Sequence, residues 1–144
     1  MPSFSKSSRN KLNTCHEDLQ LLFNEVIKHR DCTIIYGHRS VELQQELFAQ
    51  GRTKPGKIVT HLDGVNRLSK HNYNPSLAVD VVPYFKEKPH IRWDDIDSFK
   101  EFGNFVLGVA KALKEKRFIE NDIQWGGNWF SFPDMPHYQL KLNT

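Results

Sequence analysis

The sequence is poor in cysteine and contains no long hydrophobic run. Its two cysteines, Cys15 and Cys32, stand far apart and form no Cys-x-x-Cys pair, so neither a redox motif nor a zinc ribbon is indicated. We expect both to be reduced residues of the core. No apolar stretch approaches the roughly 18 residues needed to cross a bilayer, so the sequence predicts no membrane span.

The amino terminus also lacks the basic and then apolar segment of a secretory signal. We therefore expect the protein to stay in the cytoplasm of the cell that produces it. The chain has 144 residues and a formal net charge of +3, which suits one globular domain over residues 1–144 without a further binding module. The slight positive charge favours a polyanion, whether a cell-wall polymer or a nucleic acid.

Apolar residues recur in two different patterns along the chain. Steps of three and four predict helices over residues 12–27 and from Asp94 or Asp95 to Lys116, and Ser40 is a suitable N-cap for a helix that stops at Gly51. Short runs at 32–36, 77–82, 123–125 and 137–140 are typical of strands, and residues 51–76 predict a long irregular loop. The mixture predicts an α+β domain, with helices packed on a small, mainly antiparallel sheet.

Asp80 lies within the apolar run Leu77 to Val82. A lone buried carboxylate costs several kcal/mol unless a positive group pairs with it, and a metal ion is the simplest such group. His71 lies one loop upstream, and His137 begins another strand-like run. Two imidazoles and one carboxylate form a ligand set for one zinc ion and leave a coordination position for water. The sequence therefore predicts a zinc site made by His71, Asp80 and His137.

A second carboxylate, Asp134, stands three residues before His137. Because metal-bound water is acidic near neutral pH, Asp134 is placed to act as its general base, and the implied reaction is hydrolysis of an amide or ester. His61 and Asp63, in the long loop, are rival ligands. In the competing structural interpretation, Asp80 caps a turn and His137 packs in the core.

Aromatic residues are concentrated near the carboxyl terminus. Trp125, Trp129, Phe130 and Phe132 offer more aromatic surface than packing at a chain end requires, so we expect one or two of them to line a groove for substrate. The pair Gly126-Gly127 permits a tight backbone turn toward the site.

Four segments, in this order, resemble a known family. They are Ser-x-His (69–71), Ala-Val-Asp (78–80), Trp-Gly-Gly-x-Trp (125–129) and Asp-x-Pro-His (134–137). The family comprises the zinc peptidases that cut bacterial cell-wall peptides: D-alanyl-D-alanine carboxypeptidases, vancomycin-resistance dipeptidases and bacteriophage L-alanyl-D-glutamate endolysins. The resemblance covers residues 10–140 and implies a D,D-peptidase or hedgehog-like fold. The small size is closest to the phage endolysins.

The resemblance also implies roles for individual residues. The zinc ligands would be His71, Asp80 and His137, the catalytic base Asp134, the cation beside the scissile carbonyl Arg39, and the residues of the pocket Gln44 and Ser69. There are two departures from the family pattern. The eight residues Asn72 to Val79 make a longer connection than usual, and His38 stands where a Tyr is common.

The function implied by the resemblance is hydrolysis of the L-alanyl-D-glutamate bond in the peptidoglycan stem peptide. The enzyme would be a monomer that acts on the wall after release from the producing cell, without nucleic acid and without membrane insertion. One alternative is a D,D-carboxypeptidase or D-Ala-D-Ala dipeptidase. Another is a non-catalytic, metal-bearing binding module, against which Asp134 argues. A His-metal nuclease would need a ββα unit with a paired His base, and the sequence offers no such cluster.

Overall fold

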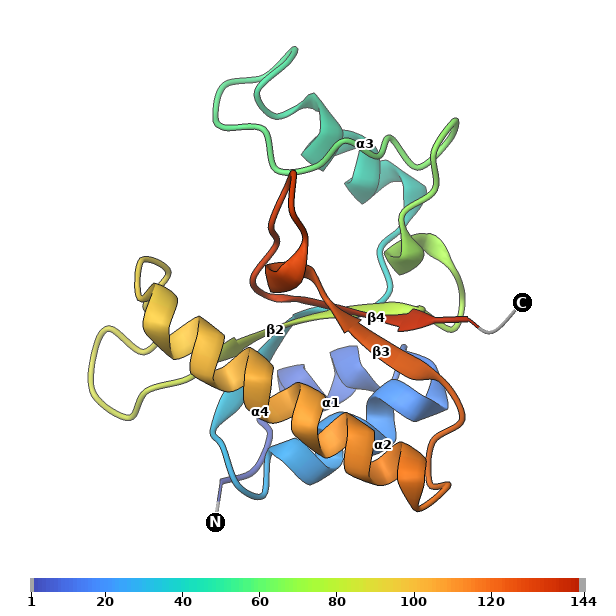
Figure 1. Cartoon of the computed structure of the whole chain (residues 1–144). Coiled ribbons are helices and arrows are strands. Elements are labelled where there is room, and N and C mark those ends of the chain that lie inside the picture. The colour runs from blue at the N-terminus through green and yellow to red at the C-terminus, as the bar shows by residue number, and fades with distance from the viewer. Residues whose placement is uncertain (1, 143–144) are drawn as a thin grey trace.

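The computed structural model describes residues 2–142. Along the chain lie α1 (Lys6–Leu12), α2 (Glu17–Val26), β1 (Cys32–Tyr36), α3 (Val41–Ala49), the 3₁₀ helix η1 (Lys70–Asn72), β2 (Ala78–Pro83), α4 (Ile96–Glu115), β3 (Asp122–Trp125), the 3₁₀ helix η2 (Gly126–Asn128) and β4 (His137–Lys141) (Figure 1).

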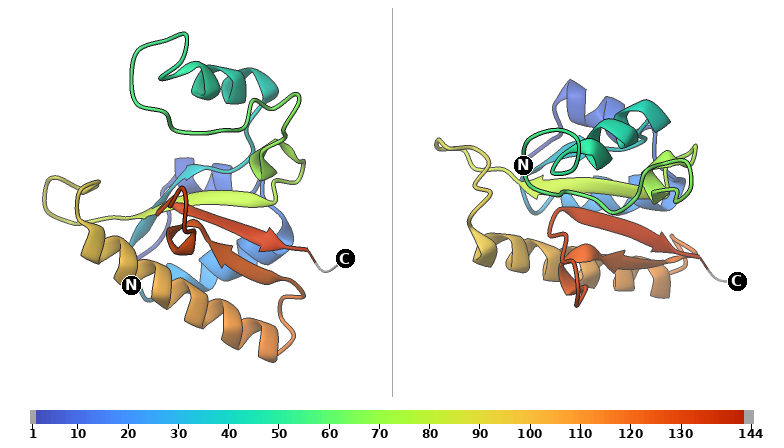
Figure 2. Two further views of the ribbon diagram at one scale, coloured as in Figure 1. Left: turned by 45° about the horizontal axis from the view of Figure 1, so that its top comes forward. Right: turned by 90° about the horizontal axis from the view of Figure 1, so that it is seen from above.

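A four-stranded antiparallel sheet in the order β1-β2-β4-β3 divides the molecule into two layers. Helices α1, α2 and α4 lie against one face of the sheet, while α3 and the irregular segment after it stand over the other (Figures 1 and 2). This arrangement confirms the predicted α+β fold.

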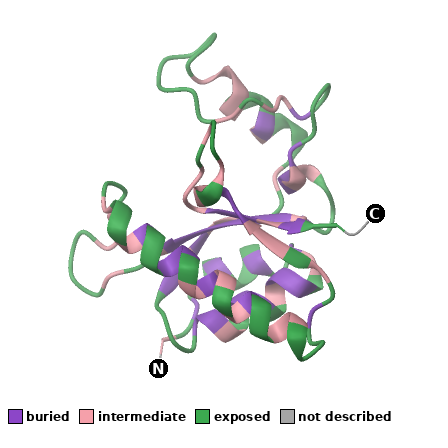
Figure 3. Ribbon diagram, in the orientation of Figure 1, coloured by how far each residue is buried: buried purple, intermediate pink, exposed green. Residues whose placement is uncertain are grey.

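Alternation along the two central strands separates the core from the site. Val79, Val81, Tyr138 and Leu140 face the helices and belong to the hydrophobic core. Because successive side chains of a strand point to opposite faces, Asp80 and the residue paired with it across the strands, His137, face the other way. Figure 3 shows the contrast: β2 is almost wholly buried and α4 alternates between buried and exposed residues, whereas the layer around α3 is largely exposed.

The single helix predicted over residues 12–27 is wrong, because the chain breaks between α1 and α2. The His16 side chain accepts a hydrogen bond from the Asp18 backbone and starts α2. Cys15 instead forms a bridge with the distant residue Ser76, a contact that sequence periodicity cannot reveal. Cys15 and Cys32 are buried free thiols, as expected.

Helix α4 follows its prediction closely, with the Asp95 side chain capping its first turn. One face of the helix is buried through Phe102, Val106 and Ala110, and the other carries charge. Among the described residues, no helix has both the length and the apolar character required of a membrane span. Gly103 brings α4 against Trp125: a Cβ at this position would stand 2.4 Å from the indole ring.

Gly103→Ala is therefore expected to destabilise the fold by about 1–3 kcal/mol, the usual cost of forcing extra volume into a packed core. Gly108→Ala, in the same helix, is the matched control, since a Cβ at Gly108 would meet nothing within 4 Å. That control should be neutral or stabilising by up to about 1 kcal/mol, because Ala favours helix over Gly. Urea unfolding of the two variants measures the difference, and equal stabilities would contradict the packing described.

Candidate metal centre

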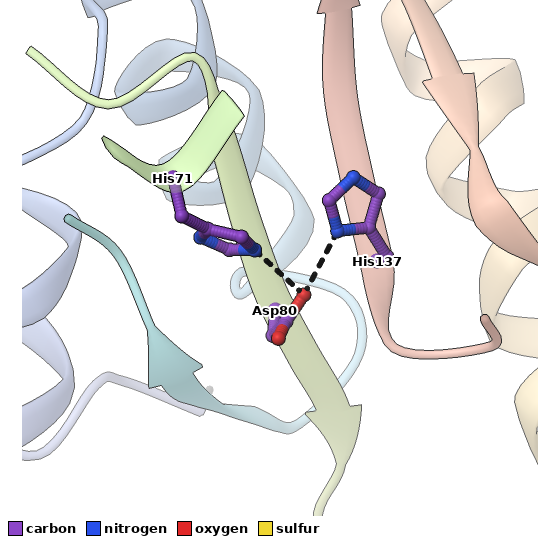
Figure 4. A group of neighbouring side chains, drawn as sticks. All are labelled: His71, Asp80 and His137. Atoms are coloured by element: carbon purple, nitrogen blue, oxygen red, sulfur yellow. Dashed lines mark hydrogen bonds and ion pairs between the residues drawn. The ribbon is translucent and has the colours of Figure 1, made fainter. Parts of the chain in front are cut away.

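Three separate segments bring His71, Asp80 and His137 together (Figure 4). They meet on the face of the sheet that is turned away from α1, α2 and α4, which we call the open face. The Oδ1 atom of Asp80 lies 3.2 Å from Nε2 of His71 and 3.2 Å from Nδ1 of His137. All three side chains are buried, and their potential ligand atoms lie within 4.8 Å of one another. The predicted trio is thus brought to one point.

The donor set fits a divalent cation. Nδ1 of His71 lies 2.8 Å from the backbone oxygen of Gly37, which only accepts hydrogen bonds, so this nitrogen carries the proton. The other nitrogen, Nε2, then directs a lone pair toward Asp80. A lone pair facing a carboxylate is unfavourable unless a proton or a cation stands between them, and two imidazoles with one carboxylate are a set suited to zinc and related ions.

Burial and the neighbouring charged groups shift the pKa values of all three residues in opposite directions. Burial disfavours the ionised form of Asp80, but the two imidazoles outweigh that effect and hold its pKa well below its ordinary value. Burial lowers the pKa of His71 despite the opposing charge of Asp80. Burial also acts to lower the pKa of His137. There the hydrogen bond to Asp80 and the charge of Asp80 outweigh burial, so the pKa is raised. The carboxylate is the charge around which the cluster is organised.

Arg39 holds the other oxygen of this carboxylate. Its Nη2 donates to Oδ2 of Asp80 over 2.7 Å, which leaves Oδ1 facing the imidazoles. The backbone N–H of Arg39 donates to the carbonyl of His71, so the end of β1 is tied to η1. Gly37, just after β1, lets the chain pass close to α1, since a Cβ there would lie 2.2 Å from the Lys11 carbonyl oxygen.

Asp134 lies at the edge of the cluster, its Oδ2 atom 3.9 Å from Nδ1 of His137. Its backbone is held by Gly126, whose carbonyl accepts the Asp134 N–H and whose absent side chain leaves room for Asp134 and His137. Burial and the nearby charge of Asp80 raise the pKa of Asp134 to about 6. Such a carboxylate exchanges a proton near neutral pH.

A pocket of about 440 Å³ opens beside these residues, a size typical of small-ligand sites. Its walls include Ser69 and Trp129, and the Trp129 ring lies 5.1 Å from that of His137. The segment before β4 rises to the irregular segment near α3 (Figure 1), where Phe132 packs on His61 with ring centroids 4.6 Å apart. The two segments close the pocket on one side.

Two residues predicted to contact substrate are placed differently, and the prediction for them is corrected. Gln44 is fully buried: it accepts a hydrogen bond from Arg39 and donates to the carbonyl of Leu62, so it fastens the long loop to the arginine. Trp125 lies in the core, with Nε1 donating to the Met135 carbonyl. Sequence could not show this, because the partner of the indole, Gly103, belongs to a distant helix.

The rival ligands do not join the cluster. His61 lines the pocket and lies 3.3 Å from Arg52, while Asp63 accepts backbone hydrogen bonds that close a turn of the loop. Ser69 has a structural task besides lining the pocket, since its hydroxyl accepts the backbone N–H of His71 and caps η1. His38, the second departure from the family pattern, is exposed.

The long connection from His71 to Asp80 forms a loop whose two ends lie side by side, and it leaves the cluster intact. The Leu77 N–H donates to the Lys70 carbonyl, and Tyr73 projects into solvent. Residues 68–71 line the pocket, but none of residues 72–79 does so. The extra length therefore lies outside the pocket wall.

The fold and the cluster define a class: a small α+β domain whose sheet carries a candidate mononuclear metal centre on its open face. The chain belongs to the family described as phage L-alanyl-D-glutamate peptidase, which matches residues 2–141.

One relative supports this assignment, and one solved structure shares the fold. The chain is 38% identical over 114 residues to the peptidoglycan L-alanyl-D-glutamate endopeptidase CwlK of Bacillus subtilis (strain 168); the match covers 78% of this chain and 62% of CwlK, so the chain spans less than two thirds of that relative. The crystal structure of the Serratia marcescens L-Ala D-Glu endopeptidase ChiX matches with a TM-score of 0.70 and 22% identity, over 97% of this chain and 91% of that one. At this identity, the second match shows a shared fold.

Zinc should stabilise the folded protein through these three side chains. A ligand that binds only the folded state at 100 times its Kd adds about 2.7 kcal/mol, so the Tm of the metal-free protein should rise clearly on zinc addition. His71→Ala should abolish the rise. His61→Ala, which changes a histidine of the same pocket outside the cluster, should keep it. Loss of the rise in His61→Ala alone would contradict the ligand assignment.

Proposed function

We propose that the protein is a zinc peptidase that hydrolyses the L-alanyl-D-glutamate bond of the peptidoglycan stem peptide. The observation that carries the proposal is the joint placement of His71, Asp80 and His137 with Asp134 at their edge, in a chain of a family described by that activity. Three protein ligands are the number typical of catalytic zinc, which keeps one position for water or substrate.

Asp134 is the proposed general base. When bound, the ion supplies Lewis acidity, which polarises a carbonyl and makes water more acidic. Asp134 then accepts the proton of the attacking water and returns it to the departing amine, so one carboxyl group serves both steps. A pKa raised to about 6 suits this double role, because proton gain and proton loss are then both easy near neutral pH.

Arg39 is the proposed stabiliser of the negative charge that develops on the carbonyl oxygen. Its Nη atoms bond Asp80 and Gln44, while its Nε is buried without a hydrogen-bond partner among the described residues. Arg39 also lines the pocket that adjoins the cluster. Its positive charge can therefore stabilise an oxyanion that forms there, which is the electrostatic stabilisation that acyl transfer requires.

The pocket suits a peptide with anionic groups. Trp129 and Phe132 provide apolar walls, and Ser69, Lys70 and Arg39 provide polar and cationic ones. Such a mixture of apolar surface and few polar groups is typical of sites that orient a small substrate.

Asp134→Asn is expected to lower turnover of purified peptidoglycan by about 10²–10⁴-fold, the usual contribution of a positioned acid or base. Zinc content should stay unchanged, because Asp134 is not a ligand in the proposed site. Asp97→Asn, an exposed residue of α4, is the matched control and should act like the wild type.

The products are identified by mass spectrometry of the released fragments. New amino termini on D-glutamate support the proposed bond, whereas free D-alanine would identify a D,D-carboxypeptidase. A protein that binds zinc and peptidoglycan without releasing any fragment would be a binding module, and the proposed base would then be wrong.

The pH profile provides a separate test. Asp134 acts as a base only when ionised, so kcat/KM should rise with pH through its pKa and fall below it, with the acid limb at or below about pH 6. A bound cation favours the carboxylate, so binding moves this limb toward lower pH. The profile is measured at constant zinc occupancy. An identical limb in the residual activity of Asp134→Asn would show that another group controls it.

A further inference from the structure

Next to His137 lies a pair of glutamines to which the proposed chemistry assigns no role, and one of them, Gln139, also lines the pocket. Gln139 follows two residues later on the same face of β4, and Gln124 faces it in the register of β3. Nε2 of His137 lies 2.8 Å from Oε1 of Gln139. The Nε2 atom of Gln139 in turn donates to Oε1 of Gln124 over 3.0 Å.

This chain of hydrogen bonds favours one tautomer of His137. The Gln139 amide oxygen and the Asp80 carboxylate both only accept, and a neutral imidazole carries one N–H. The contact with Gln139 is the shorter one, 2.8 Å against 3.2 Å to Asp80, so it favours the proton on Nε2. Nδ1 then presents its lone pair toward Asp80 and the centre of the cluster. The opposite tautomer would place an N–H there, and that nitrogen could not bind a metal ion.

The two histidines differ in how firmly this choice is fixed. His71 donates to the backbone carbonyl of Gly37, which has no donor to offer in exchange. Gln139 has a donor and an acceptor on the same amide, and rotation of that amide would direct its NH₂ group at His137. Rotation of the Gln139 amide alone would break the hydrogen bond from its NH₂ group to Oε1 of Gln124.

We propose that Gln139, oriented by Gln124, is a positioning residue that selects the metal-binding tautomer of His137. The inference rests on the metal site of the proposed function, but not on peptidase activity. Groups that hold the second nitrogen of a ligating histidine typically change metal affinity by about 10–100-fold, so the effect is measurable in binding alone.

The test is zinc affinity, measured by competition with a chelator on protein that starts metal-free. Gln139→Met keeps the length of the side chain and removes the acceptor, so Kd should rise by about 10–100-fold. Gln139→Glu offers only acceptors and should bind at least as tightly as the wild type. Gln124→Met should weaken binding by less than Gln139→Met does. Gln50→Met, remote from the cluster, is the control and should leave Kd unchanged.

A second readout separates tautomer selection from general loss of structure. In the ¹H NMR spectrum of the zinc-loaded protein, the Nε2–H of His137 should be protected from exchange with water. Gln139→Met should lose this signal and keep the Nδ1–H signal of His71. Simultaneous loss of both signals would indicate structural damage and overturn the proposal.

A Gln139→Met variant that binds zinc within about twofold of the wild type would also overturn the proposal, as would Gln139→Glu behaving like Gln139→Met. The two proposals fail in different ways. A wild type that binds zinc but cleaves no peptidoglycan refutes the function and leaves the tautomer proposal testable. A wild type that binds no zinc refutes both.

Discussion

A buried carboxylate on the open face of the sheet is the constraint on which the site depends. Asp80 cannot remain ionised there without charged or hydrogen-bonding partners, and the fold supplies neighbours from three directions. Arg39 arrives from the end of β1 and takes one oxygen, while His71 and His137 face the other. A divalent cation among these ligands would balance the carboxylate and give the lone pair of His71 a partner.

The supports around the cluster are mainly close approaches of backbone. Gly37 and Gly126 stand where a side chain would collide with neighbouring backbone, and each fixes a group of the site: the carbonyl that orients His71, and the turn that presents Asp134. The helices on the other face of the sheet anchor β2 and β4 through the core. Rigid strands whose connections are held by backbone hydrogen bonds are the kind of scaffold that holds a catalytic geometry within tight limits.

Much of this site could be predicted from local patterns. An acidic residue inside an apolar strand is visible in sequence, whereas the common face of Asp80 and His137 follows from the pairing of β2 with β4. The errors arose where distant contacts decide. Cys15 leaves the predicted helix because it bridges to Ser76, and Trp125 is buried because α4 presents Gly103 to it. Gln139 lies on the same face of β4 as His137, as strand alternation requires, but its role needs Gln124, which belongs to another strand. The single-domain organisation, the monomeric state and the cytoplasmic location stay predictions.

The most direct test of the account is the position of the bound metal. Crystals of the zinc-loaded protein, measured at the zinc absorption edge, should show one anomalous peak. It should lie about 2.0–2.2 Å from Nε2 of His71, Nδ1 of His137 and a carboxylate oxygen of Asp80, with Asp134 beside the open position. A peak bound elsewhere, or no peak despite zinc in the crystal buffer, would contradict the central claim.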